Sequence, residues 1–220
     1  MKLLTKPSKT CYVCGGEPSS QEHVPARGFF LDDASYRKQL ITVPSCDRHN
    51  QDTSADDEYT RNIITAHHAN NSLAFKQFKE KVVKSLKLNI TNFGKPRKIV
   101  TPQGTVYAFE FDRTIFDRVI RKIGYGIFFH TYKYQWNREL IILSRHLVYS
   151  DLSYDDYGKL LISVEKELPD LPSNGENPQV FKYSILKSGP KDEDSIIKLT
   201  FYEGFTVWLT IVIGSTTWKF

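Results

Sequence analysis

The sequence predicts an α+β protein, in which a small N-terminal strand–strand–helix unit is followed by helices and a C-terminal α+β domain with antiparallel strands. Two short turns carrying cysteine and histidine flank the first unit, apolar residues recur at helical spacing in the middle of the chain, and short apolar stretches separated by turn residues fill its end. The 220 residues allow one or two domains. We place a boundary between residues 92 and 93, where the composition changes near Gly94.

The composition is that of an ordinary soluble globular protein, with 40% hydrophobic and 25% charged residues. The first residues turn polar at once, and no apolar run approaches the roughly 18–20 residues that span a bilayer. We therefore expect no signal peptide and no membrane partner, and a cytoplasmic location in which thiols stay reduced. The net charge of +5 permits a polyanionic partner without requiring one.

All three cysteines fall in two short motifs, Cys11-x-x-Cys14 and Cys46-x-x-His49. Two intervening residues are typical of a tight turn whose two side chains face one ion, and the two glycines after Cys14 suit such a turn. A Cys3His set closes a tetrahedral structural zinc site. An odd cysteine count argues against a disulfide framework, while a redox role for the first pair remains the alternative. We predict a structural Zn²⁺ that joins the two ends of this segment.

Between and after these motifs the sequence predicts two strands and a helix. The first strand covers Gln21 to Val24, and the return strand covers Leu40 to Val43 and is bounded by Pro44. The helix begins with Ser54 as its N-cap, has acids in its first turn beside the helix dipole, and runs to about Asn70. We expect its buried face to carry Tyr59, Ile63 and Ala66.

Taken in order, these motifs resemble those of the HNH endonucleases. The matching segments are Cys11-x-x-Cys14, Glu22-His23-Val24-Pro25, Leu40 to Asn50 and Ser54 to Tyr59. They look most like the prokaryotic branch whose ββα-metal unit is held by a zinc knuckle, and they cover roughly the first third of the chain. The resemblance implies metal-dependent hydrolysis of phosphodiester bonds in nucleic acid, with DNA favoured over RNA and with 5′-phosphate and 3′-hydroxyl ends left.

The resemblance also assigns roles to single residues. His23 matches the general base that takes a proton from the attacking water, for which an imidazole pKa near working pH is suited. Glu22 and Asn50 match the ligands of a catalytic divalent ion, commonly Mg²⁺. Glu22 departs from the usual aspartate. The middle asparagine of the family has no clear match, and Gln39 is the best-placed substitute.

The purely structural alternatives are that Glu22 and His23 form a surface pair and that Asn50 caps a helix. The acids that follow have first of all a structural role at the helix N-terminus, and a secondary interpretation makes one of them a further metal ligand or a support for a ligand. These acids are Asp56, Asp57 and Glu58.

The interval after this helix is strongly basic, with eight basic residues against one acid between Lys76 and Lys98. A helix from Leu73 to Leu88 is expected to bury one apolar stripe, followed by a loop-like segment. A solvated helix face is the ordinary explanation, and contact with nucleic-acid phosphates is the second. The candidate contact residues are Lys76, Lys79, Lys84, Lys87, Arg97 and Lys98.

In the second part we predict a strand over Thr105 to Phe111 and a helix that begins at Asp112 or Thr114. Two glycines inside this helix indicate close packing against a neighbour. The tail predicts three strands, a two-residue turn between the last two of them, and a preceding surface loop. The helical glycines are Gly124 and Gly126, the strands cover Gln179–Leu186, Ser195–Tyr202 and Phe205–Ile213, the turn is Glu203-Gly204, and the loop is Pro169–Pro178.

No catalytic motif marks this second part, and His67 and His68 ahead of it lie outside any motif, as surface or domain-contact residues. The second part is expected to select substrate, to hold a homodimer, or to sense a regulatory partner, as in a toxin or phage-defence effector. The rival to the nuclease is a non-catalytic zinc module that binds nucleic acid or a partner protein.

Overall fold

The computed structural model describes residues 10–83, 95–101, 104–147, 154–168, 171–187, 191–192 and 194–211. The elements are β1 (Ser20–His23), β2 (Thr42–Ser45), α1 (Ser54–Thr65), α2 (Ser72–Gln77), β3 (Lys95–Thr101), β4 (Gly104–Glu110), α4 (Arg113–Tyr132), β5 (Leu140–Leu143), α5 (Tyr154–Glu167), β6 (Asn174–Asn177), β7 (Phe181–Lys187), β8 (Ser195–Phe201) and β9 (Phe205–Ile211). The α+β prediction is confirmed. Among the described residues, no helix combines the length and apolar character needed to cross a membrane.

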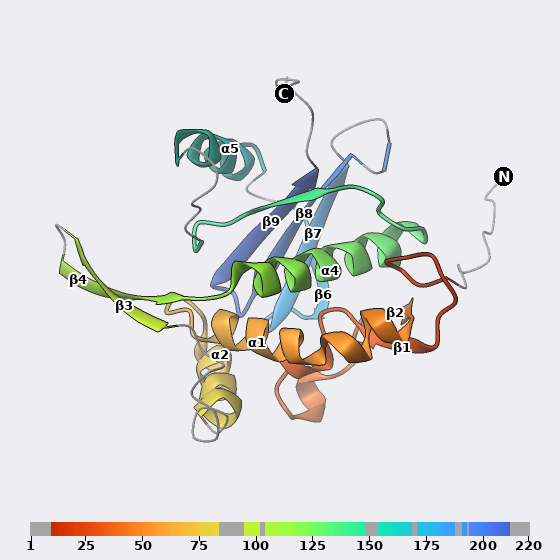
Figure 1. Cartoon of the computed structure of the whole chain (residues 1–220), viewed down its shortest axis with the longest axis horizontal. Helices are drawn as coiled ribbons and strands as arrows, with labels where there is room; N and C mark the ends of the chain where they lie inside the picture. Colours follow the sequence, from red (N-terminus) through yellow and green to blue (C-terminus); the bar gives the residue numbers. More distant parts are fainter. Residues whose placement is uncertain are drawn as a thin grey trace.

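The largest element of the fold is a five-stranded antiparallel sheet with strand order β5-β9-β8-β7-β6, and α4 runs across one of its faces (Figure 1). Alternate residues of β8 join the main core on the α4 side, among them Ile197 and Leu199. Ile196 of β8 and Trp208 of β9 face the other way and pack with Leu161 of α5. Because both faces of the sheet are covered, β8 and β9 carry apolar residues on both sides.

Helix α4 is packed closely on two sides, and its two glycines make this packing possible. A Cβ at Gly124 would lie 2.4 Å from Leu209 Cδ1 of β9, and a Cβ at Gly126 would lie 2.6 Å from Val24 Cγ2, next to β1. Real side chains do not approach so closely. The close packing predicted for both glycines is confirmed, and α4 is the layer between the sheet and the N-terminal unit.

In the N-terminal unit, β1 pairs with β2 in antiparallel register, with His23 opposite Thr42, and α1 follows. The predicted order of strand, strand and helix is observed. The return strand differs from the prediction, because it continues through Pro44, which pairs with Gln21. Among the residues that the structure describes, this sheet has two strands, so both are edge strands, where proline is tolerated without its N–H.

Helix α1 ends at Thr65 instead of Asn70, and the prediction of its buried face is wrong. Tyr59, Ile63 and Ala66 are only half-buried. The face turned inward is mainly polar, and Asp57, Arg61 and Thr65 have ion-pair or hydrogen-bond partners there, so the apolar pattern did not reveal it. The buried residues of α1 are Asp57, Thr60, Arg61, Asn62, Ile64 and Thr65.

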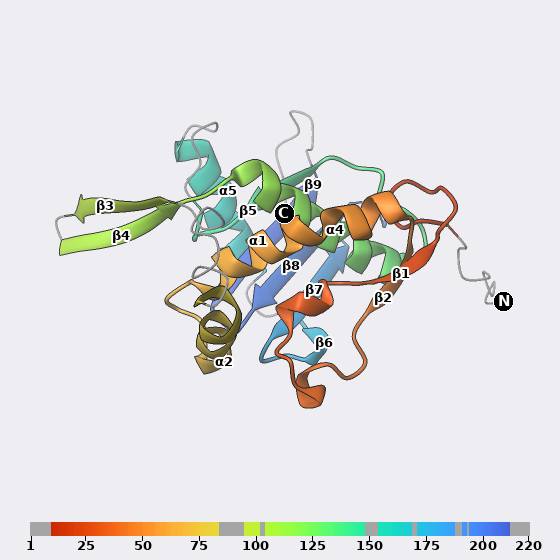
Figure 2. The same cartoon turned by 60° about the horizontal axis from the view of Figure 1, so that its bottom comes forward.

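Three segments of the chain differ from the predicted loops and turns. The segment from Lys95 is strand β3, which pairs with β4 in a hairpin that extends away from the body (Figure 2). The predicted loop at 169–178 contains the edge strand β6. The turn between β8 and β9 has three residues, Tyr202 to Gly204, because Phe201 pairs with Phe205. Gly204 is pressed against the chain at Ala69, whose carbonyl oxygen would lie 2.2 Å from a Cβ.

The two predicted domains share one core. The boundary predicted at 92/93 falls outside the described residues. Phe29 comes before it in the sequence and Phe201 after it, yet the centroids of their rings lie 5.7 Å apart. The Tyr202 hydroxyl donates a hydrogen bond to the Phe29 carbonyl, and Asn71 Nδ2 donates to the Gln179 carbonyl at 2.8 Å. The main core cluster contains residues from both parts of the chain.

A second contact between the parts involves histidines. The ring of His67, two residues after α1, lies 4.1 Å from the ring of His146 and 5.4 Å from that of Phe205. Burial, reinforced by the neighbouring His146 and His68, lowers the pKa of His67 to about 4. His67 is therefore a contact residue that stays neutral, whereas His68 is exposed.

Candidate metal centre and adjacent pocket

Each of the two short cysteine motifs folds into a hydrogen-bonded turn. In the first, the backbone N–H of Cys11 donates to the Gly16 carbonyl at 2.7 Å, and the N–H of Gly15 donates to the Cys11 carbonyl at 2.9 Å. Gly15 has φ of +72°, a conformation that glycine adopts without strain. In the second, the N–H of His49 donates to the Cys46 carbonyl at 3.0 Å. Each turn thus brings its two potential ligands together.

The four side chains of the two turns converge. Their ligand atoms all lie within 4.8 Å of one another. Cys14 Sγ is 3.9 Å from Cys46 Sγ, and His49 Nδ1 is 3.2 Å from Cys46 Sγ and 3.6 Å from Cys11 Sγ. A tetrahedron with zinc–sulfur bonds of about 2.3 Å separates its sulfurs by roughly 3.8 Å. Cys11, Cys14, Cys46 and His49 are therefore close enough to bind a metal ion, as predicted.

Two of these four residues have pKa shifts that favour their metal-binding forms, whereas burial and the neighbouring Cys11 raise the pKa of the Cys46 thiol. Burial opposes ionisation of Cys11, but backbone N–H groups of Cys14, Cys46 and Val13 outweigh it and lower the pKa of the thiol. Burial and the charge of Arg48 lower the pKa of His49, which favours its neutral imidazole. Thiolate and neutral imidazole are the forms that coordinate a metal.

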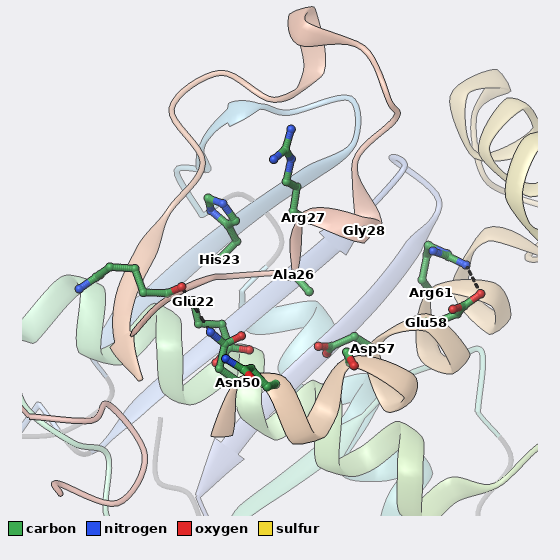
Figure 3. A pocket seen from close by; sticks show the side chains of 12 residues that line it. Glu22, His23, Ala26, Arg27, Gly28, Asn50, Asp57, Glu58 and Arg61 are labelled. Carbon is green, nitrogen blue, oxygen red and sulfur yellow. Dashed lines mark hydrogen bonds and ion pairs between the residues drawn. The ribbon is translucent and has the colours of Figure 1, made fainter. Parts of the chain in front are cut away.

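Close to this cluster lies a pocket of about 500 Å³, bounded by β1, the turn that follows it, the segment after the second cysteine motif, and α1. Figure 3 shows His23 and Arg27 on one side of it and Asn50 and Asp57 on the other. The structure thus brings together Glu22, His23 and Asn50, as the sequence predicts. It does not bring Gln39 to them, since this residue is exposed, has φ of +49° and is not among those that line the pocket.

His23 ends β1 and is half-buried beside the pocket. Burial, followed by the charge of Arg27, lowers the pKa of its imidazole below the ordinary value. The side chain is therefore neutral at neutral pH, the form that can accept a proton. A hydrogen bond with the Ile41 backbone opposes this lowering, and the Nδ1 atom of the ring is buried.

Glu22 points the other way, into the protein, because adjacent residues of a strand face opposite sides. Its side chain is 3% exposed, so the interpretation of Glu22 as a surface residue is wrong. Oε1 lies 2.8 Å from Lys122 Nζ. Oε2 accepts hydrogen bonds from the Tyr12 hydroxyl at 2.9 Å and from Ser45 Oγ at 3.3 Å. Both carboxylate oxygens are therefore occupied by protein partners.

Lys122 comes from α4 and joins two carboxylates. Its Nζ lies 2.8 Å from Glu22 Oε1, 2.8 Å from Asp57 Oδ2 and 2.8 Å from Thr53 Oγ1. Burial raises the pKa of Asp57 to about 6, and Lys122 opposes this rise. Sequence reasoning missed Lys122, whose only signal is a lysine next to the apolar stripe of its helix, far along the chain from Glu22.

Asn50 is held by its amide nitrogen. Nδ2 donates to Ser20 Oγ at 2.9 Å and to the Gln21 carbonyl at 3.4 Å, which leaves Oδ1 as the atom able to accept a bond or bind a cation. Its side chain makes no capping hydrogen bond to the turn at Gln51–Thr53, so the alternative of a helix cap is wrong.

Two arginines beside the pocket were not predicted. Arg27 is exposed, whereas Arg61 is buried and donates to Glu58 at 3.2 Å and to Asn62 at 2.7 Å. Arg27 lies only four residues after His23, so proximity to the candidate base was a usable signal.

The predicted basic residues lie on other elements. Lys76 of α2, Lys79 of the π-helical turn Phe78–Val82 and Lys98 of β3 are exposed. Arg97 belongs to β3, but its side chain lies outside the description, as do Lys84 and Lys87 entirely. Exposure leaves the first three able to contact a ligand.

Comparison of the chain with models of known protein families, with curated proteins and with solved structures found no match.

Proposed function

We propose that the protein is a metal-dependent endonuclease of the HNH type, which hydrolyses phosphodiester bonds of nucleic acid in the pocket beside the Cys3His cluster, with Zn²⁺ as the structural metal of that cluster. The observation that carries the proposal is the meeting of His23, Asn50 and carboxylates in one pocket, next to four metal-ligand side chains. DNA is the favoured substrate, on the strength of the sequence resemblance alone.

The residues of the pocket support a separate role for each of three side chains in the proposed reaction. His23 is a neutral imidazole whose Nδ1 is buried, so Nε2 is the nitrogen left to take the proton from an attacking water. Exposed Arg27 next to it is suited to bind a phosphate oxygen, and Asn50 Oδ1 to bind a cation. A divalent ion such as Mg²⁺, when bound, would neutralise charge on the departing oxygen.

The test is cleavage of supercoiled plasmid by the zinc-loaded chain with Mg²⁺, Mn²⁺ or EDTA. We expect the wild type to nick or linearise the plasmid only with added metal. His23→Ala should lower the rate by roughly 100-fold or more, because it removes the base. The matched control is His68→Ala, which alters an exposed histidine away from the pocket and should cut like the wild type. Zinc content and circular dichroism verify that each variant is folded.

The contrary result is a zinc-loaded wild type that cuts neither DNA nor RNA with any of these metals. If it binds duplex with a strong salt dependence, and if His23→Ala binds equally well, the protein is a binding module, and Lys76, Lys79 and Lys98 become the residues to change. As part of the nuclease proposal, we propose that a homodimer or a regulatory partner controls the activity through the C-terminal part, as in a phage-defence or toxin effector.

A further inference from the structure

One of the carboxylates that line the pocket, that of Asp57, has a buried oxygen without a hydrogen-bond partner in the described part of the chain. This residue lies in the first turn of α1 and is 9% exposed. Oδ2 lies 2.8 Å from Lys122 Nζ, while buried Oδ1 has no hydrogen-bond partner among the described residues. Figure 3 shows the carboxylate pointing toward Glu22 and Asn50. Buried carboxylate oxygens are usually paired, so an unpaired one on a residue that lines a pocket points to a ligand.

Lys122 cannot satisfy this second oxygen. An ammonium group has three N–H donors, and those of Lys122 have three acceptors at 2.8 Å, on Glu22, Asp57 and Thr53. The same contacts fix the carboxylate of Asp57 through its other oxygen. Lys122 is therefore suited to hold Asp57 in place and leaves Oδ1 to the pocket.

The charges of the site also favour a cation. Glu22 and Asp57 share the single positive charge of Lys122, so this buried cluster carries one excess negative charge. The neighbouring charges on α1 cancel in pairs, Glu58 with Arg61 and Asp56 with Arg118. Exposed Arg27 remains on the His23 side of the pocket. A buried excess negative charge is destabilising, and either a bound cation or protonation of Asp57, whose pKa burial raises to about 6, relieves it.

Glu22 differs from Asp57 in this respect. Its two oxygens already accept from Lys122, Tyr12 and Ser45, and it connects the N-terminal unit to α4. We propose that Asp57, together with Asn50, binds the divalent ion of the pocket in place of Glu22, and that Lys122 is the positioning residue for Asp57. This inference rests on the proposed function for the use of the ion. It makes a residue of the C-terminal part necessary to the site.

The test measures binding of Mn²⁺ to the zinc-loaded full chain by the electron paramagnetic resonance signal of free Mn²⁺. We expect Asp57→Asn to weaken Mn²⁺ binding roughly 100-fold and Lys122→Met roughly tenfold, with partial recovery in Lys122→Arg, which keeps the charge. Glu22→Gln should weaken it less than Asp57→Asn. The matched control is Asp56→Asn, which alters the adjacent acid, paired with Arg118 and outside the pocket lining, and should bind like the wild type.

The inference is overturned if Asp57→Asn binds Mn²⁺ like the wild type, if Glu22→Gln loses as much affinity, or if the wild type shows no such site. Plasmid cleavage separates this from the proposed function. If the protein binds Mn²⁺ through Asp57 but does not cut plasmid, the proposed nuclease activity is refuted and the proposed metal site is retained. If the Asp57→Asn variant cuts plasmid at the wild-type rate, the proposed metal site is refuted and the proposed nuclease activity is retained. Zinc content and circular dichroism confirm that each variant is folded.

Discussion

The metal cluster and the pocket beside it are neighbours, but they are assembled in different ways. The cluster takes all four ligand side chains from two short turns between Cys11 and His49, each closed by its own backbone hydrogen bonds. The pocket depends on Lys122, which reaches it from α4, and α4 is in turn positioned by the sheet. A local motif thus specifies the first site, whereas only the complete fold specifies the second.

The largest effect should come from the local site. Cys11→Ser removes a buried ligand, and structural zinc binding supplies free energy on the order of 10 kcal/mol to such a unit. We expect loss of bound zinc and of cooperative thermal unfolding. Ser19→Ala is the control, because Ser19 donates across the same turns to Asp47 at 2.6 Å without being a ligand, and it should cost about 1 kcal/mol. A zinc-free Cys11→Ser protein with wild-type stability would show that the metal does not hold the fold.

The next effect concerns the assembled site. Lys122→Met leaves two buried carboxylates without their cation, and we expect a loss of about 3–5 kcal/mol in the free energy of unfolding by urea. Arg118→Met, one turn earlier on α4, breaks a pair whose arginine side chain is 56% exposed, against 9% for Lys122, and should cost about 1 kcal/mol at most. Equal losses would mean that the pocket does not depend on α4 as described.

A smaller effect tests the contact between α4 and the N-terminal unit. Gly126→Ala places a methyl group 2.6 Å from Val24, and we expect it to destabilise the protein by about 1–3 kcal/mol in urea unfolding. Gly158→Ala on α5 is the matched control, since nothing lies within 4 Å of its Cβ, and it should stabilise the helix by about 0.5–1 kcal/mol. Removing Val24 Cγ atoms, as Val24→Ala, should recover part of the loss. No recovery would place the strain elsewhere.

These differences explain how much of the molecule could be predicted. The Cys3His group, the order of β1, β2 and α1, and the strands β7 to β9 follow from spacing and apolar pattern, which act over a few residues. The buried face of α1 could not be predicted, because Asp57 and Arg61 are inside only by virtue of partners on other side chains. Patterns of apolar residues carry no information about such pairs.

The candidate site was predictable to the same extent. His23, Asn50 and Glu22 do meet in the pocket, since Glu22 and His23 lie on β1, which pairs with β2, and β2 leads into the second turn and Asn50. The orientation of Glu22, however, depends on Lys122 and Tyr12, and Gln39 stays away because the loop that carries it turns outward. A motif located these residues along the chain, but the long-range contacts decide what each side chain can do.

The position of α4 determines when, during synthesis of the chain, the pocket can be fully assembled. The cysteine turns and the pocket residues of α1 leave the ribosome first, Lys122 follows, and Leu209, against which Gly124 packs, comes near the end of the sequence. An incomplete chain can hold a metal ion in the first turns while α4 still lacks the sheet on which it rests. If the protein cuts nucleic acid, we therefore expect the nascent chain to be inactive until β9 has been made.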